Sequence, residues 1–115
     1  MIALLKRNTT AFEPTLLYIA DHGESLGENG IYLHGLPYMI APRTQTHVPL
    51  IVWGSAESDL DISSIKQRSN DAYSHDSIAN ALIGLFEIKT SEPMKSADDS
   101  ILAFKPESTL PPPLP

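Results

Sequence analysis

The sequence contains no cysteine among its 115 residues. This absence excludes disulfide bonds, thiolate metal sites and a cysteine nucleophile. It leaves the cellular compartment open, because proteins without disulfides occur both inside and outside cells. Basic residues are also few, since 8 Lys and Arg stand against 14 Asp and Glu for a net charge of −6. A chain of this charge repels phosphate backbones, so no nucleic-acid partner is expected.

Long hydrophobic runs are missing as well. The two longest, Leu16–Ala20 and Val48–Trp53, fall far short of the roughly 20 residues that a membrane-spanning helix needs. At the start, the apolar Met1–Leu5 is followed by Lys6 and Arg7, which is the reverse of the order in a secretory signal. The sequence therefore predicts neither a membrane span nor an export signal of its own.

The composition that is present, 42% apolar and 19% charged, is typical of a globular protein. Two continuous apolar runs, residues 15–20 and 47–53, predict strands covered on both faces, as in a parallel sheet. Between them, residues 23–46 hold four of the chain's six glycines and predict a long functional loop with short helical turns.

Helical patterns are fewer. Residues 1–8 resemble the end of a helix, and the polar residues 57–71 predict a surface connection with one helical turn. Ser74 is expected to cap a helix with Asp76 in its first turn. The apolar stripe of that helix is Ile78, Leu82, Leu85 and Phe86. From residue 91 to residue 115 the chain is predicted to be an extended Pro-rich tail that touches the body in places.

The order of strand, long loop, strand, connection and helix favours an α/β sheet over a β-sandwich. Two strands and one good helix do not close a hydrophobic core. The fold is therefore expected to be incomplete as it stands, and to need either more sheet or association with another surface.

The tetrapeptide Asp21-His22-Gly23-Glu24 directly follows the first strand, where open α/β sheets place catalytic groups. Aspartate and neutral histidine are good zinc ligands, and a bound divalent ion can neutralise phosphate oxygens. The alternative is a strand ending in an Asx-turn, with Asp21 bonded to backbone N–H groups and His22 in solvent.

A wider set of motifs surrounds this tetrapeptide. It comprises Tyr18 to Glu28 (YIADHGESLGE), Tyr32 to Gly35 (YLHG), Pro37-Tyr38, Ala41-Pro42, Gln45 to Pro49 (QTHVP), Ser74 to Asp76 (SHD) and Gly84 to Phe86 (GLF). Together they closely resemble the lipid A type phosphoethanolamine transferases, in the sulfatase branch of the alkaline-phosphatase-like superfamily. The resemblance runs from about residue 12 to residue 90. It implies that residues 1–90 are the C-terminal part of the catalytic domain, an α/β/α sandwich.

By this resemblance, the intact family members transfer phosphoethanolamine from phosphatidylethanolamine to lipid A or a core sugar. They are expected in the inner membrane, with a periplasmic catalytic domain and a zinc-dependent phospho-threonine intermediate. Asp21 and His22 would be two of the zinc ligands, and His34 would lie on the substrate side or near a second metal. The family's threonine nucleophile has no counterpart here, because Thr9, Thr10 and Thr15 precede the motif too closely. The chain alone is therefore expected to bind zinc weakly and to form no phosphoenzyme.

Two other interpretations stay open at this stage. The chain could be a non-catalytic product of a truncated gene, or a fragment of a related sulfatase or phosphoglycerol transferase. For four other polar residues, the first expectation is a structural or solvent-exposed position and not a place in the site. His47 is expected to be structural, and His75 to be neutral and bonded to a carboxylate. Glu24 and Glu28 are expected in solvent, with the orientation of His22 or His34 as the alternative.

Overall fold

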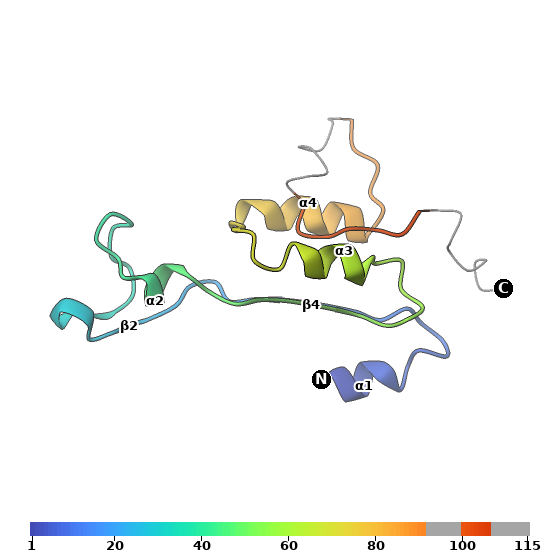
Figure 1. Ribbon diagram of the computed structural model, residues 1–115, viewed down its shortest axis with the longest axis horizontal. Coiled ribbons are helices and arrows are strands. Elements are labelled where there is room, and N and C mark those ends of the chain that lie inside the picture. Colours follow the sequence, from blue (N-terminus) through green and yellow to red (C-terminus); the bar gives the residue numbers. More distant parts are fainter. Residues whose placement is uncertain (92–99, 107–115) are drawn as a thin grey trace. The chain divides into compact units, whose positions relative to one another are not determined.

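A computed structural model describes residues 1–91 and 100–106 of the chain (Figure 1). The rest of the expected tail, residues 92–99 and 107–115, lies outside the described residues. The chain divides into two compact units, Leu16–Trp53 and a second unit made of Met1–Thr15 with Gly54–Pro115. Each unit is considered by itself below.

The two predicted strands are present as β1, Thr15–Ile19, and β4, Leu50–Gly54. They pair with each other in a two-stranded sheet. The second strand begins three residues later than predicted, after Pro49, whose missing N–H cannot contribute to a sheet.

Hydrogen bonds just beyond the strands give their relative direction. At one end, the Ser55 amide donates to the Pro14 carbonyl oxygen over 3.1 Å. At the other, the Gly23 amide donates to the Gln45 carbonyl oxygen over 2.8 Å. The end of β4 therefore lies beside the start of β1, and the two strands run in opposite directions. The predicted parallel arrangement is wrong for this pair, because apolar content reports burial and not strand direction.

Neither strand is covered on both faces by the described residues. Most of their side chains are half-buried, and Tyr18 and Ile51 are about half exposed. Two strands alone are too few to enclose a core. The expected full burial is therefore not met, whereas the expectation that two strands would leave the fold incomplete agrees with this exposure.

The long segment between β1 and β4 contains short elements. A hairpin of β2, Ser25–Leu26, and β3, Tyr32–Leu33, pairs Ser25 with Leu33 and Leu26 with Tyr32. The turn of the hairpin holds the 3-10 helix η1, Glu28–Gly30, and the segment ends in the single turn α2, Arg43–Thr46. The predicted helical turns are confirmed. The hairpin was not predicted, since two-residue strands show no alternation of apolar and polar residues.

The other unit begins with α1, Ile2–Lys6, which confirms the predicted helix at the start of the chain. The Asn8 side-chain amide donates to the Leu4 carbonyl oxygen over 2.9 Å and so satisfies a group at the helix end. The polar connection also forms its expected helical turn, α3, Ile62–Gln67, which Asp61 caps through the Ser64 amide.

The best predicted helix is α4, Asp76–Leu85. The Ser74 hydroxyl accepts from the Asp76 amide over 3.3 Å, although the N-cap position itself is His75. The predicted apolar stripe is only partly right. Ala81 is fully buried, whereas Leu82 and Phe86 are exposed. The buried side of the helix is therefore centred on the small residue Ala81, which hydrophobicity alone does not single out.

The core of this unit uses residues from the C-terminal part of the chain. The buried apolar residues among those described are Leu60, Ala81, Ile101 and Leu102. Residues 100–106, red in Figure 1, run beside Asp59–Asp61. The Asp61 amide donates to the Ala103 carbonyl oxygen over 2.8 Å, and the Lys105 amide donates to the Asp59 carbonyl oxygen over 2.7 Å. The described part of the expected tail is thus packed and hydrogen-bonded.

Candidate functional site

The Asp21–Glu24 motif begins two residues after Ile19, the last residue of β1, and is held against α2 by its backbone. The Gly23 amide donates to the Gln45 carbonyl oxygen over 2.8 Å, and the Glu24 amide donates to the Thr44 carbonyl oxygen over 3.0 Å. A Cβ atom at Gly23 would clash with the Thr44 carbonyl oxygen. Glycine is therefore required here by close approach of two backbones.

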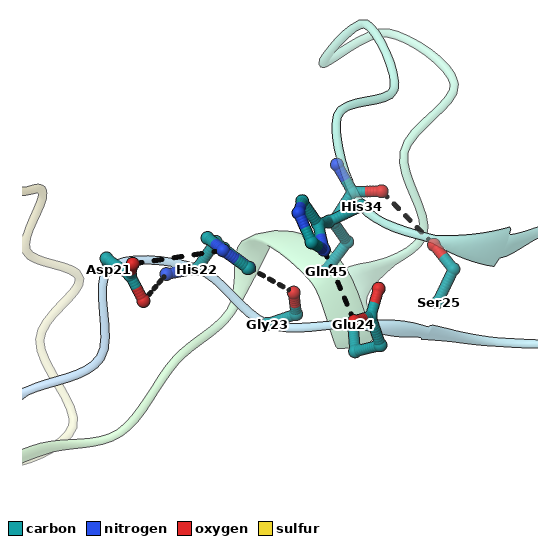
Figure 2. Close-up of polar contacts among 7 residues, drawn as sticks. All are labelled: Asp21, His22, Gly23, Glu24, Ser25, His34 and Gln45. Carbon is teal, nitrogen blue, oxygen red and sulfur yellow. Dashed lines mark hydrogen bonds and ion pairs between the residues drawn. The ribbon is translucent and has the colours of Figure 1, made fainter.

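Asp21 and His22 present their side chains to each other, as Figure 2 shows. The Asp21 Oδ1 atom accepts from the His22 amide over 3.0 Å, and Asp21 Oδ2 lies 3.8 Å from His22 Nε2. Two ligands of a tetrahedral zinc ion are about 3.3 to 3.4 Å apart when the metal bonds are about 2.0 to 2.1 Å long. The separation of 3.8 Å between Asp21 Oδ2 and His22 Nε2 is close to this value, and both side chains are accessible to solvent.

The tautomer of His22 suits metal binding. Its Nδ1 atom lies 2.7 Å from the Gly23 carbonyl oxygen, which can only accept a hydrogen bond. The Nδ1 atom therefore carries the proton, and in the neutral ring the lone pair is on Nε2, the nitrogen nearest Asp21. A histidine that binds a metal usually donates its other N–H to a carbonyl oxygen or carboxylate in this way.

The Asp21 carboxylate is favoured in its charged form. Its pKa is lowered, first by the hydrogen bond from the His22 amide and then by the charge of the His22 ring. A carboxylate that stays ionised at neutral pH is the form that binds a metal cation. The bond from the His22 amide joins Asp21 to the next residue and is not the Asx-turn of the alternative interpretation, which bonds the backbone two residues on, and it leaves Oδ2 available.

His34 is brought to the same place from β3. Its Nδ1 atom lies 3.2 Å from Glu24 Oε2, and its ring centroid lies 4.1 Å from that of His22. Leu33 and Gly35 on either side have positive φ angles of 67° and 90°. These left-handed conformations turn the chain sharply on both sides of His34. Glu24 therefore orients His34. This was the alternative interpretation of Glu24, whose first expected place was in solvent.

The second oxygen of Glu24 has no hydrogen-bond partner. Glu24 Oε1 is buried, and none of the described residues donates to it. In the group formed by Asp21, His22, Glu24 and His34, three polar atoms therefore take no part in the hydrogen bonds described above. They are Glu24 Oε1, His22 Nε2 and His34 Nε2. In residues 1–91 and 100–106, no group of three His, Asp or Glu side chains lies close enough to hold a metal ion. Asp21 and His22 fit two positions of a zinc site, and the zinc role stays a prediction.

The remaining candidates lie elsewhere or have local partners. Glu28 accepts from the Leu26 amide over 2.7 Å and from the Thr44 hydroxyl over 2.8 Å, so it is not simply in solvent. The hydrogen bond to its own backbone N–H and that from Thr44 hold its pKa below the usual value. His47 ends α2, and its Nδ1 atom lies 3.4 Å from Arg43 Nη2. His47 thus has a local contact within α2, which agrees with the expected structural role.

Two residues near the site escaped sequence reasoning. Gln45 and Ser25 are both buried, and the Ser25 hydroxyl donates to Gln45 Oε1 over 3.1 Å. A buried polar residue in a one-turn helix follows no periodic pattern. The only available signal was their position within the motifs that carry the family resemblance.

Comparison with known proteins identifies the protein family to which this chain belongs. The model of the Sulfatase family matches residues 1–88. The chain belongs to the sulfatase family, and its mixed helix and strand structure matches part of an alkaline-phosphatase-like soluble domain.

Particular relatives narrow the comparison to phosphoethanolamine transferases. Phosphoethanolamine transferase EptA of Salmonella typhimurium is 44% identical over 103 residues, which are 85% of this chain and 19% of the relative. The crystal structure of the C-terminal periplasmic domain of phosphoethanolamine transferase EptC from Campylobacter jejuni is 48% identical with a TM-score of 0.70. That match covers 78% of this chain and 28% of the solved domain.

A third similar protein is the integral membrane protein lipooligosaccharide phosphoethanolamine transferase A from Neisseria meningitidis. It is 38% identical with a TM-score of 0.76, over 91% of this chain and 20% of that structure. The chain thus spans about a fifth of the length of these full-length relatives. No helix in the described part of this chain is both long and apolar enough to cross a membrane.

Proposed function

We propose that this chain forms part of the active site of a phosphoethanolamine transferase, in which Asp21 and His22 hold a zinc ion. The observation that carries the proposal is the distance of 2.7 Å between His22 Nδ1 and the Gly23 carbonyl oxygen, from which the tautomer of His22 is inferred. Its Nδ1 proton is committed to the Gly23 carbonyl oxygen, so Nε2 is left as the metal-binding atom on the side of Asp21 Oδ2.

The zinc ion would supply positive charge to the phosphoryl oxygens and lower the pKa of a bound hydroxyl. The chain's own residues prepare its place. The hydrogen bond from the His22 amide lowers the pKa of Asp21 further, so the charged carboxylate that a cation requires is favoured. The backbone of α2 holds Gly23 and Glu24, so the turn that carries both ligands is fixed on one side.

His34 is proposed to contact the phosphoethanolamine group. Its Nδ1–H donates to Glu24 Oε2, which leaves Nε2 to accept a proton or a hydrogen bond from the substrate. The ring lies over His22, with 4.1 Å between the centroids, so a group bound at the metal would also lie near His34. No nucleophile is assigned within this chain.

The donor and acceptor are proposed to be phosphatidylethanolamine and lipid A, at the periplasmic face of the inner membrane. Two of the similar proteins support the location, because one is a periplasmic domain of a phosphoethanolamine transferase and the other is an integral membrane lipooligosaccharide phosphoethanolamine transferase. Incubation of the purified chain with phosphatidylethanolamine and zinc should leave its intact mass unchanged, since no nucleophile is expected here. A stable phosphoenzyme in that experiment would contradict the assignment.

Zinc binding can be measured by calorimetry on the full chain. We expect weak binding by the natural sequence, and at least a tenfold loss in His22→Ala and in Asp21→Asn. Changes around a metal ligand alone cost about 10-fold to 100-fold in affinity, so removal of a ligand should cost no less. His75→Ala is the matched control, because His75 belongs to the other compact unit. Tight binding that His22→Ala leaves intact would show that the ligand assignment is wrong.

A further inference from the structure

The unit Leu16–Trp53 has an unusual interior. All of its residues are described, and the two that are buried are both polar, Ser25 and Gln45. They are bonded to each other, since the Ser25 hydroxyl donates to Gln45 Oε1 over 3.1 Å. Apolar burial is non-directional, whereas a hydrogen bond requires a defined distance and angle. The buried residues of this unit therefore fix the relative position of two segments through a hydrogen bond, and they contribute little hydrophobic stabilisation.

Gln45 connects three segments of the candidate site. Its backbone carbonyl accepts from Gly23, and its Oε1 accepts from Ser25, which follows Glu24 in the sequence. Its Nε2 donates to the Leu36 carbonyl oxygen over 3.5 Å, two residues after His34. Figure 2 shows Gln45 between the strand that carries the motif and the loop that carries His34.

The hydrogen bonds of Gln45 reach the segment that carries His22 and also the segment that carries His34. On one side they fix Gly23 and Ser25, and with them His22 and Glu24. On the other side the contact at Leu36 limits where the loop after His34 can lie. An amide that is buried costs free energy unless its donor and acceptor are both used, as they are here. A purely space-filling role at this position would be met better by leucine or methionine.

We propose that Gln45 is a positioning residue that sets the separation of the His22 and His34 rings. None of the hydrogen bonds given above for Gln45 goes to either ring, and it acts through Gly23, Ser25 and the loop at Leu36. The importance of this separation for phosphoethanolamine transfer rests on the proposed function. The positioning itself does not, because it concerns the metal-free chain.

The test is the nuclear Overhauser effect between ring protons of His22 and His34 in the full chain without metal. The ring centroids are 4.1 Å apart, so the effect should be visible in the natural sequence. In Gln45→Met, which keeps the volume and removes both side-chain hydrogen bonds, the inter-ring effect should be lost. Effects between β1 and β4 should persist, which shows that the unit is still folded. Gln67→Met is the matched control, since Gln67 is exposed and lies in the other unit, and it should change neither signal.

A folded Gln45→Met variant that keeps the inter-ring effect would overturn the proposal. Equal loss of the effect in Gln67→Met would overturn it as well. If Gln45→Met does not fold, Ser25→Ala decides, because it removes only the hydroxyl that donates to Gln45. Loss of the inter-ring effect in folded Ser25→Ala supports the proposal, and retention contradicts it. A failure of the natural chain to bind zinc would count against the proposed function and would leave this result unaffected.

Discussion

Gly23 packs so closely on Thr44 that a methyl group at its α-carbon would overlap the Thr44 carbonyl oxygen. The same approach allows the Glu24 amide to donate to that oxygen over 3.0 Å. The glycine of the Asp-His-Gly-Glu motif is thus explained by the backbone of α2. Its role is to let the turn that carries Asp21 and His22 lie in hydrogen-bonding contact with the helical turn α2.

Replacement of Gly23 by alanine should therefore separate the two backbones. We expect Gly23→Ala to destabilise the chain by about 1 to 3 kcal/mol, the usual cost of overpacking a close contact. Urea denaturation followed by circular dichroism measures the change. Gly30→Ala is the control, because a Cβ there meets no atom within 4 Å and only the positive φ angle adds strain. Equal stability of Gly23→Ala and the natural sequence would show that the close contact is not present in solution.

Glu28 and Thr44 should act as one unit. The carboxylate accepts from both the Thr44 hydroxyl and the Leu26 amide, so Glu28→Gln and Thr44→Val each remove or weaken a bond between η1 and α2. Their effects on the midpoint of urea denaturation should add to less than their sum in the double variant, since both changes act on the one Glu28–Thr44 bond, whereas the Leu26 bond depends on Glu28 alone. Fully additive effects would contradict the bond. Thr90→Val, combined with Glu28→Gln, is an additive control from the other unit.

Leu33 adopts a backbone conformation that disfavours a leucine. Its φ angle is 67°, and its side chain is 70% exposed, so little burial offsets the strain. The left-handed conformation costs an ordinary residue about 1 to 2 kcal/mol, and glycine adds about 0.5 to 1 kcal/mol of chain entropy. Leu33→Gly should consequently stabilise the chain by about 0.5 to 1 kcal/mol.

The matched control for Leu33 is the leucine of the other strand of the hairpin, Leu26, which pairs with Tyr32. Leu26 is equally exposed, and its φ angle is not among the positive ones of the described residues. Leu26→Gly should therefore destabilise the chain by about 0.5 to 1 kcal/mol. Thermal or urea denaturation of the two variants gives the comparison. Destabilisation of similar size in both would show that Leu33 is not held in a left-handed conformation.

The hydrogen bonds of Asp61 lead us to predict how the stability of the chain changes in acid. Hydrogen bonds from the side chains of Ser63 and Ser64, and from the Ser64 amide, lower the pKa of Asp61 to about 2. Its folded pKa lies below the unfolded value of about 3.9, so the stabilising contribution is complete above that value. It should be lost as the pH falls from about 4 to about 2.

Substitution separates this contribution from those of other carboxylates. Asp61→Asn keeps a side chain that can cap α3 but cannot titrate. It should remain close to the natural sequence in stability near neutral pH and lose less stability between about pH 4 and pH 2. Denaturation at a series of pH values measures this, with Asp71→Asn as the control that keeps the acid response. An unchanged acid response in Asp61→Asn would contradict the role of Asp61.

Local patterns in the sequence predicted the elements that depend on neighbouring residues. The apolar run at 15–20 became β1, the polar connection formed α3, and Ser74 and Asp76 mark the start of α4. Strand direction and the buried side of α4 were predicted wrongly. Both depend on contacts between segments far apart in the sequence, such as Ser55 with Pro14, which no local pattern encodes.

The candidate site was predictable in part for the same reason. Asp21 and His22 are adjacent in the sequence, and their chemical types at the end of a strand suggested a shared cation. His34 came from the family resemblance, and its ring contact with His22 became visible only in the structure. Gln45 could not be found, because its role arises from three segments that meet in space.

The packing of residues 100–106 has a practical consequence for work with this protein. Ile101 and Leu102 are two of the four buried apolar side chains in the described parts of the chain. A version that stops after Ser91, where the family match has already ended, would lose both of these buried side chains. Such a shortened protein would expose its interior to water and would tend to aggregate during purification.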